Sequence, residues 1–500
     1  MGKDNGSGRA RWWPRETGRS NIVALGLAGA VEYTLQAIVP VILVRYLTVE
    51  AVAQYRFLWL MTGTALAVAP AFMPQALFYF LPRAGGQPGA LIGNTLLYLA
   101  LVALLAAALT APWQPFLPAM ARQLFRLSHG MSSLFIGLWL LACLLDVLPT
   151  AEGRARWQAA AMVVLALLRT ALIVAAALAF GDLATLVGAL LLVALLKLAL
   201  LLRYLLSRQQ RLAWHGQLLR RQLAYALPFA CGNALFLLRG QADQWVVAGM
   251  LPAAAFAPFA IAGVFLPLAA LVRVPVNNVL LGRLNSAHAA GQLGDMARLI
   301  AKANGMTAML LLPLCGGLMV MAPELVQIIY TARYRAAVPV MQVLLIGVIG
   351  SAFAVGHVLA ALDRGRMALL IGLAGLVLSV GLSIVGVQVW GLAGAAIGSV
   401  ATLVLGEAAA LLVVAAALGT RVRQLLAWSM LVPTVLATSL AGLAVWSAGT
   451  TQGAPWPALL MKCALYGLVF LPVFVLSGGP RQLALGLGLG LGRAPPAHPY

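Results

Sequence analysis

Long apolar segments alternate with short polar and basic ones along the chain, from residue 22 to about residue 477. A helix needs about 20 mostly apolar residues to cross the hydrocarbon core of a bilayer. By this rule the sequence predicts an all-α polytopic membrane protein with about fourteen transmembrane helices. The expected spans are 22–44, 57–80, 90–111, 131–149, 158–180, 183–203, 223–247, 253–272, 305–323, 339–362, 367–389, 391–417, 425–447 and 457–477.

The composition agrees with this pattern. Of the 500 residues, 63% are hydrophobic and only 9% are charged, against about 25% charged residues in average soluble domains. These values exclude a soluble enzyme, a nucleic-acid-binding module and a disordered chain. The four cysteines have no CxxC spacing, so we expect small buried hydrophobic residues and neither disulfides nor a metal site. They are Cys143, Cys231, Cys315 and Cys463.

The distribution of basic residues predicts the topology. The net charge is +21, from 33 basic and 12 acidic residues. If the N-terminus is inside, 23 of the basic residues lie in inner segments, 6 in outer segments and 4 within spans. This asymmetry follows the positive-inside rule. It predicts cytoplasmic termini in a bacterial inner membrane, and the polar residues 1–20 do not read as a cleaved signal peptide.

A weak internal repeat predicts two lobes. At an offset of 204 residues, three positions after the first span match three after the seventh: Leu47 with Leu251, Ala53 with Ala257, and Tyr55 with Phe259. Parallel repeats of this kind are typical of transporters. The expected parts are a basic N-terminus, a first six-helix lobe, a linker, a second six-helix lobe, two added spans and a low-complexity tail. Their ranges are 1–20, 21–206, 207–222, 223–420, 421–478 and 479–500.

Four segments resemble one family of membrane proteins. The first span leads into RYLTVEAVAQY, where Arg45, Tyr46, Leu47 and Tyr55 match a family pattern and Thr48 and Ala53 replace its glycines. The seventh span keeps the pattern's proline and aspartate, at Pro228 and Asp243, with Gln244 in place of a common basic residue. Segment 322–345 has matches at Tyr334, Ala337 and Gln342, and WGLAGAAIGSV at 390–400 is similar to the entry of the family's twelfth span.

In these residues, over roughly 20–420, the chain resembles the multidrug/oligosaccharidyl-lipid/polysaccharide exporter superfamily and its bacterial polysaccharide flippases. The resemblance implies two six-helix bundles around a V-shaped central cavity. It also implies that the protein is a monomer that moves an undecaprenyl-diphosphate-linked oligosaccharide from the cytoplasmic to the periplasmic leaflet by alternating access. The implied partners are that lipid, the membrane lipids and other proteins of polysaccharide assembly, without nucleic acid.

Charged residues inside the spans are the candidate site. A charge at the bilayer centre is costly, so it faces a cavity or a partner. Arg239 or Arg169 is expected to bind the diphosphate, because guanidinium matches phosphate oxygens. Glu32 and Asp243 are candidates for coupling to H⁺ or Na⁺, and Glu407 is a further cavity residue. No catalytic residue, metal site or cofactor is expected.

A structural role for the same charges is the alternative. Arg239 and Asp243, four residues apart, are expected on one helix face and would then pair with each other. Arg169 and Glu407 would each pair with a neighbour and fix the helix packing. Lys197 and Lys462 are expected to snorkel toward the membrane surface.

Two further patterns predict local structure. The loop at 273–304 has helically spaced apolar residues and is expected to contain an interfacial amphipathic helix. Small residues recur in the eleventh and twelfth spans and predict close helix packing. They are Gly372, Gly375, Ser379, Ser383, Gly391, Gly394 and Gly398.

Other functions stay open at this point. A polytopic glycan polymerase, ligase or glycosyltransferase has similar hydropathy, but the outer acidic residues Glu50, Asp182 and Glu324 are too widely separated for a divalent-cation site. A lipid II flippase or a drug/cation antiporter would keep the fold and change the cargo. The fourteen spans suit both the polysaccharide and the lipid II flippases, whereas antiporters usually have twelve.

Overall fold

The computed structural model describes residues 18–83, 88–114, 117–208, 212–449 and 454–482, and these form helices, turns and loops without a strand. Most of the expected basic N-terminus and most of the tail lie outside the described residues. Eleven helical segments are long and apolar enough to cross a membrane, and two bent helix pairs raise the number to thirteen. One of the eleven is a 53-residue helix in which the chain reverses direction. Counting its two halves as separate spans raises the number from thirteen to the fourteen expected. The chain is a multi-pass membrane protein.

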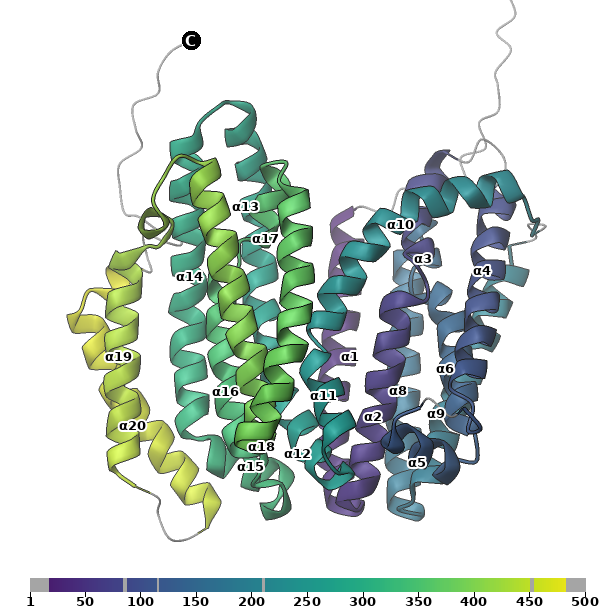
Figure 1. Cartoon of the computed structure of the whole chain (residues 1–500), viewed down its shortest axis with the longest axis horizontal. Helices are drawn as coiled ribbons and strands as arrows, with labels where there is room; N and C mark the ends of the chain where they lie inside the picture. Colours follow the sequence, from purple (N-terminus) through teal and green to yellow (C-terminus); the bar gives the residue numbers. More distant parts are fainter. Residues whose placement is uncertain (1–17, 84–87, 115–116, 209–211, 450–453, 483–500) are drawn as a thin grey trace, which may run out of the picture. The chain divides into compact units, whose positions relative to one another are not determined.

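The described residues up to 47 and from 57 to 234 form a first compact unit, and those from 48 to 56 and from 235 onward form a second. The boundary falls inside the helix that contains the expected seventh span. Figure 1 labels the helices of both units. Those that build the first unit, wholly or in large part, are α1 (Gly18–Tyr46), α2 (Val49–Val68), α3 (Met73–Phe80), α4 (Pro88–Leu109), α5 (Ala119–Leu127), α6 (Met131–Ala142), α7 (Leu148–Ala151), α8 (Ala155–Ala179), α9 (Leu183–Leu206) and α10 (Gly216–Arg239).

Two spans of the first unit are broken. Helices α2 and α3 meet at a 40° bend, where Ala71 and Phe72 adopt left-handed backbone conformations with φ of 46° and 61°. Between α6 and α7 the chain passes through a 3-10 turn at Cys143–Asp146. Non-helical backbone at membrane depth is tolerated where protein or a cavity satisfies its polar groups. Both breaks therefore mark places to look for a cavity.

The short connection at 181–182 leads directly into the first turn of helix α9. Gly181 has φ of 67°, and the Asp182 side chain accepts a hydrogen bond from the backbone N–H of Thr185 at 2.9 Å. Asp182 thus caps α9, satisfying one of the free N–H groups of its first turn. The hydrogen bonds from the Thr185 hydroxyl and N–H hold the pKa of Asp182 below its usual range. The fifth and sixth spans are therefore separate helices, as the sequence predicts.

The second unit contains the end of α10 and the helices after it. They are α11 (Ala242–Met250), α12 (Ala253–Ala262), α13 (Leu268–Ala289), α14 (Leu293–Val320), α15 (Ala322–Tyr330), α16 (Ala337–Gly350), α17 (Gly356–Ala361), α18 (Gly365–Ala417), α19 (Trp428–Ser447) and α20 (Pro455–Leu476). In Figure 1, α19 and α20 lie side by side. One core of this unit is formed by α13, α14, α17 and α18, with Leu284, Ile300 and Val414 fully buried in it.

The expected interfacial helix at 273–304 is wrong. Helix α13 continues to Ala289 and α14 begins at Leu293, so the segment is a helical hairpin that extends two spans. The apolar residues that suggested an interfacial helix pack within this hairpin: Leu284, Met296 and Ile300 are each fully buried. A stripe of apolar residues is the same whether a helix lies on lipid or on another helix, so the sequence pattern could not distinguish the two.

Helix α18 turns back on itself at Gly391. This residue has φ of 61° and ψ of −137°, a conformation that is essentially restricted to glycine. The two halves then pack at backbone distance: the Ser383 hydroxyl donates to the Ala395 carbonyl at 3.1 Å. A Cβ on Gly386 or Gly394 would overlap the carbonyl of the other residue. The predicted close packing is confirmed for Gly394 and Gly398, whereas Gly372 has open space around it.

Two lysines do not snorkel. The Lys462 Nζ lies 2.6 Å from Glu324 Oε1, and the two side chains are 5% and 9% exposed. The Lys197 Nζ lies 2.7 Å from Asp146 Oδ2, with the lysine side chain 6% exposed. Both expectations are wrong, because an acidic residue inside the protein compensates the charge of each lysine. Asp146 is 51 residues from Lys197 in sequence, and Glu324 is 138 residues from Lys462.

Lys462→Ala is expected to lower the free energy of unfolding by about 3–5 kcal/mol, because it leaves the buried Glu324 carboxylate without its counter-charge. The second oxygen of that carboxylate already has no hydrogen-bond partner among the described residues. The measurement is thermal unfolding of the purified protein in detergent. The matched control is Lys462→Met with Glu324→Gln, which removes both charges and should recover most of the loss. Equal destabilisation by the single and the double variant would contradict the ion pair's role.

Candidate functional site

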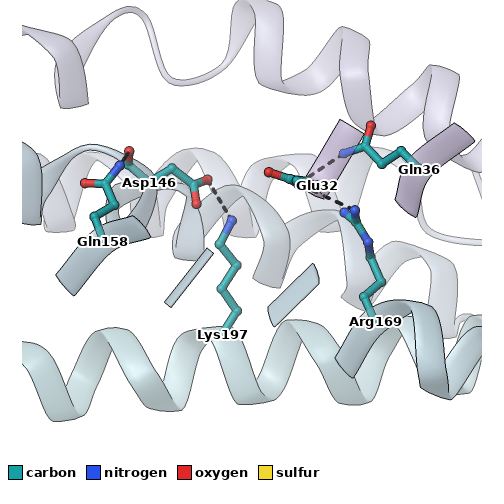
Figure 2. Close-up of polar contacts among 6 residues, drawn as sticks. All are labelled: Glu32, Gln36, Asp146, Gln158, Arg169 and Lys197. Carbon is teal, nitrogen blue, oxygen red and sulfur yellow. Dashed lines mark hydrogen bonds and ion pairs between the residues drawn. The ribbon is translucent and has the colours of Figure 1, made fainter. Parts of the chain in front are cut away.

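The first unit brings Glu32 and Arg169 together. Arg169 Nη2 lies 3.5 Å from Glu32 Oε1, and the side chains are 8% and 25% exposed. The Gln36 amide donates to the same glutamate at 3.1 Å. Helix α1 packs along α8, which places the two charges side by side. Figure 2 shows the guanidinium of Arg169 pointing at the glutamate. The sequence left two roles open for Arg169, diphosphate binding or pairing with a neighbour. The structure shows a pair with Glu32, which is also a predicted site residue.

Two tryptophans connect this pair to a second one. The guanidinium of Arg169 lies 5.6 Å from the ring centroid of Trp59, and Trp59 makes an edge-to-face contact with Trp139 at 5.7 Å. The Lys197 ammonium lies 4.4 Å from the Trp139 ring and pairs with Asp146 (Figure 2). Cations are attracted to aromatic faces, more strongly when desolvated. The result is one continuous polar and aromatic network through the first unit.

The exposures within this network follow a pattern. Both cations are nearly buried, whereas the Asp146 side chain is 58% exposed and that of Glu32 is 25% exposed. Each buried cation is compensated, as burial of a charge requires. The accessible groups are therefore carboxylate oxygens that can accept hydrogen bonds, and the two pairs together carry no net charge. Asp146 is not among the candidate site residues that the sequence predicts.

Asp243 lies on α11 and does not pair with Arg239. The chain bends by 51° between α10 and α11, so the two residues do not share one helix face. Asp243 is 5% exposed. Its carboxylate accepts from the Gln244 N–H at 2.8 Å and has the Ser399 hydroxyl on α18 as a polar neighbour. The expected Arg239–Asp243 pair is wrong because α10 ends at Arg239.

Arg239 packs against small residues of α18. A Cβ on Gly375 would lie 3.2 Å from Arg239 Cδ, and one on Gly406 would lie 3.4 Å from Nη1. Because glycine has no side chain, these two positions leave room for the side chain of Arg239. The next residue, Glu407, interacts electrostatically with Arg239. The structure thus brings together two predicted site residues, Arg239 and Glu407.

Arg273 is a third member of this cluster that the sequence does not indicate. It falls in the segment expected as a loop at 273–304, but it is 5% exposed. It donates to the Ala352 carbonyl at 2.8 Å, to Asn304 Oδ1 at 3.1 Å and to the Ala354 carbonyl. It also interacts electrostatically with Glu407. These carbonyls are free because the chain leaves helical geometry at Ser351–Phe353.

Arg239, Glu407 and Arg273 form what we call the unit 2 charge cluster, with two cations and one carboxylate. Its formal charge is +1, in contrast to the neutral pairs of the first unit. Such a cluster can hold an anion through guanidinium hydrogen bonds. No group of three or more His, Cys, Asp or Glu residues is arranged to hold a metal ion within the described parts of the chain.

Comparison with solved structures identifies the fold. The structure is similar to "Lipid II flippase MurJ, inward closed conformation", with a TM-score of 0.70 and 13% identity, covering 92% of this chain and 99% of that one. It is also similar to an inward-facing multidrug resistance MATE family transporter of the MOP superfamily, with a TM-score of 0.61, 15% identity and coverage of 80% and 98%. The chain therefore has the same fold as these MurJ and MATE structures.

Sequence comparison adds a match of part of the chain to a family model. Residues 155–339 match the model of a family described as "Polysaccharide biosynthesis protein". The superfamily resemblance and the all-α fold expected from the sequence are therefore confirmed, and the matched family agrees with the polysaccharide branch. A third superfamily structure, the MATE transporter VcmN from Vibrio cholerae, has a TM-score of 0.51 and 16% identity over 80% of this chain and 98% of its own. A search of the curated proteins found no match.

Proposed function

We propose that this protein is a flippase that moves a polyprenyl-diphosphate-linked oligosaccharide from the cytoplasmic to the periplasmic leaflet of a bacterial inner membrane. The observation that carries the proposal is the match of residues 155–339 to polysaccharide biosynthesis proteins in a chain with a transporter fold. In this proposal both termini are cytoplasmic, the protein works as a monomer by alternating access, and other polysaccharide-assembly proteins supply and use its cargo.

The diphosphate is assigned to Arg239. The unit 2 charge cluster has an excess cation, and its carboxylate does not neutralise both arginines. Arg273 is engaged with carbonyl groups, whereas Arg239 is only half-buried. Guanidinium donates two parallel hydrogen bonds to a phosphate. Arg169, the other candidate, is nearly buried against Glu32, and in this proposal it supports the site through that pair.

Glu32 and Asp243 remain the candidates for ion coupling. Each carboxylate lies inside a span and has a polar neighbour: Glu32 has Gln36 and Arg169, and Asp243 has Ser399. Binding of H⁺ or Na⁺ removes the negative charge, and a carboxylate at membrane depth changes its preferred environment strongly when it is neutralised. A proton or sodium gradient is the proposed source of energy for turnover.

Lipid II flipping is the second candidate function. The observation that favours it is the similarity in fold to MurJ, over 92% of this chain. That similarity, at 13% identity, is a similarity of fold. The family match is a similarity of sequence, so the polysaccharide cargo is preferred. A drug/cation antiporter would keep the same fold, and one of the similar structures is a multidrug resistance transporter.

Deletion of the gene tests the proposal. The expected result is loss of surface polysaccharide with accumulation of complete lipid-linked repeat units in the inner membrane, and the wild-type gene should restore both to normal. Loss of the glycan with incomplete units would point instead to an enzyme of assembly. Unchanged surface glycan would contradict the proposal, and arrested peptidoglycan synthesis in the same strain would favour lipid II as the cargo.

A further inference from the structure

A cavity of about 190 Å³ lies in the first unit, and neither Glu32 nor Arg169 lines it. Both broken spans contribute to its wall: Phe72 and Gln75 come from the bend between α2 and α3, and Asp146 comes from the 3-10 turn after α6. Asn233 on α10 completes the polar lining. We call this space the unit 1 cavity. It is smaller than the roughly 300–1,000 Å³ of sites for drug-sized ligands, so it suits one ring of a larger molecule.

The strained backbone beside the cavity supports a functional role. Ala71 and Phe72 have φ of 46° and 61°, and non-glycine residues in this region cost of order 1–3 kcal/mol each. Such strain persists where the surrounding structure enforces it, commonly at ligand sites. The consequence here is that the chain turns at Phe72 and directs the following helix, with Gln75 in its first turn, along the cavity wall.

The polar groups of the cavity are available for hydrogen bonding. Gln75 and Asn233 are exposed, and neither side chain has a hydrogen-bond partner among the described residues. Asp146 is fixed by Lys197 through Oδ2, and its side chain is 58% exposed. The cavity thus offers two amides, each a donor and an acceptor, and a carboxylate that accepts.

The charge balance of the cavity selects among ligands. The Lys197 ammonium compensates Asp146, so the carboxylate is not an uncompensated site for a metal cation. None of the described residues that line the cavity is a cation that could bind a phosphate, and an exposed carboxylate oxygen repels one. A neutral ligand with several hydroxyl groups fits both conditions, because its O–H groups donate to the carboxylate and its oxygens accept from the amides.

Phe72 in the cavity wall belongs to an aromatic cluster. Phe72 stacks on Phe229 with centroids 5.5 Å apart, Phe229 contacts Tyr225 at 5.3 Å, and Tyr225 stacks on Tyr79 at 4.5 Å. These rings hold Phe72 in place beside the amides. A fixed aromatic ring next to hydrogen-bonding groups suits a ring-shaped ligand with one apolar C–H face and polar edges.

We propose that the unit 1 cavity binds a sugar ring of the transported oligosaccharide, through Gln75, Asn233, Asp146 and Phe72. This inference rests on the proposed function and deepens it, because it assigns the glycan to a set of residues separate from Arg239. Lys197 acts in it as a positioning residue that orients the Asp146 carboxylate.

Binding of two lipids to the purified full-length protein tests this assignment. The first is the lipid-linked repeat unit extracted from the deletion strain, and the second is the same polyprenyl diphosphate without sugars. The wild-type protein is expected to bind the glycosylated lipid about tenfold more tightly. Gln75→Ala and Asn233→Ala should each remove most of that preference and leave the affinity for the sugar-free lipid unchanged. Both residues are exposed, so neither substitution opens a hole in the core. Asn277→Ala, an amide on α13 outside the cavity, is the matched control.

The outcomes separate the two proposals. Equal wild-type affinity for the two lipids would overturn the sugar assignment and leave the flippase proposal standing. A preference that survives in Gln75→Ala and Asn233→Ala, or that Asn277→Ala also removes, would overturn the cavity as the sugar site. If the wild-type protein binds neither lipid, the proposed function fails, and the sugar assignment fails with it.

Discussion

Replacing Arg239 with alanine is expected to lower the flipping rate about 10- to 100-fold. Charge-assisted hydrogen bonds contribute about 1.5–3 kcal/mol, and about 1.4 kcal/mol corresponds to a factor of ten. Adding Arg169→Ala should abolish flipping, because it also leaves Glu32 without its partner. The measurement is recovery of surface polysaccharide when each variant is expressed in the deletion strain, together with the amount of folded protein in the membrane.

Two controls make this result specific. Arg239→Lys keeps the charge but loses the paired donors of guanidinium, so its flipping rate should lie between those of the wild type and the alanine variant. Arg364→Ala removes an exposed arginine outside the charge cluster and should have no effect. Full activity of the Arg239→Ala, Arg169→Ala double variant would rule out the diphosphate assignment.

Gly394→Ala is expected to prevent folding of the α18 hairpin or to lower the melting temperature strongly. The added methyl would overlap the backbone of Gly386. Overpacking against movable side chains typically costs about 1–3 kcal/mol, and backbone atoms can move less. The two halves of α18 would have to separate along the face that holds Ser383 and Gly398. The measurement is the yield of monodisperse protein in detergent and its unfolding temperature.

Gly372→Ala is the matched control for this substitution. It lies in the same helix, and a Cβ there meets no atom within 4 Å. Because alanine is up to about 1 kcal/mol more favourable than glycine inside a helix, this variant should be as stable as the wild type or slightly more stable. Similar melting temperatures for the two variants would contradict the backbone packing of the hairpin.

The spans could be predicted from sequence because membrane helices are recognised by length and apolarity alone. The reversal at Gly391 was also predictable, since the glycine stands between two apolar segments that are each long enough to span. The hairpin of α13 and α14 was not, because an apolar stripe does not specify what covers it. The 3-10 turn at Cys143–Asp146 contains no glycine or proline that would have marked it.

The charges within spans were correctly singled out, but their partners were not. Lys197 and Lys462 each pair with an acid that is distant in sequence, and a single sequence does not encode which spans face each other. Arg239 and Asp243 were expected on one helix face, and the bend after Arg239 separates them. Gly240 was the available signal for that bend. The lining of the unit 1 cavity comes from three separate segments, so only the folded structure brings those residues together.

The most direct test of the flippase account is transport by the purified protein in vesicles. Lipid-linked repeat units from the deletion strain are incorporated into proteoliposomes, and their sugars are oxidised from outside with periodate, which does not cross the bilayer. With flippase present, the oxidised fraction should rise beyond that of protein-free vesicles, and the Arg239→Ala protein should give a much slower rise. An oxidised fraction equal to that of protein-free vesicles, under a proton gradient and under a sodium gradient, would contradict the account.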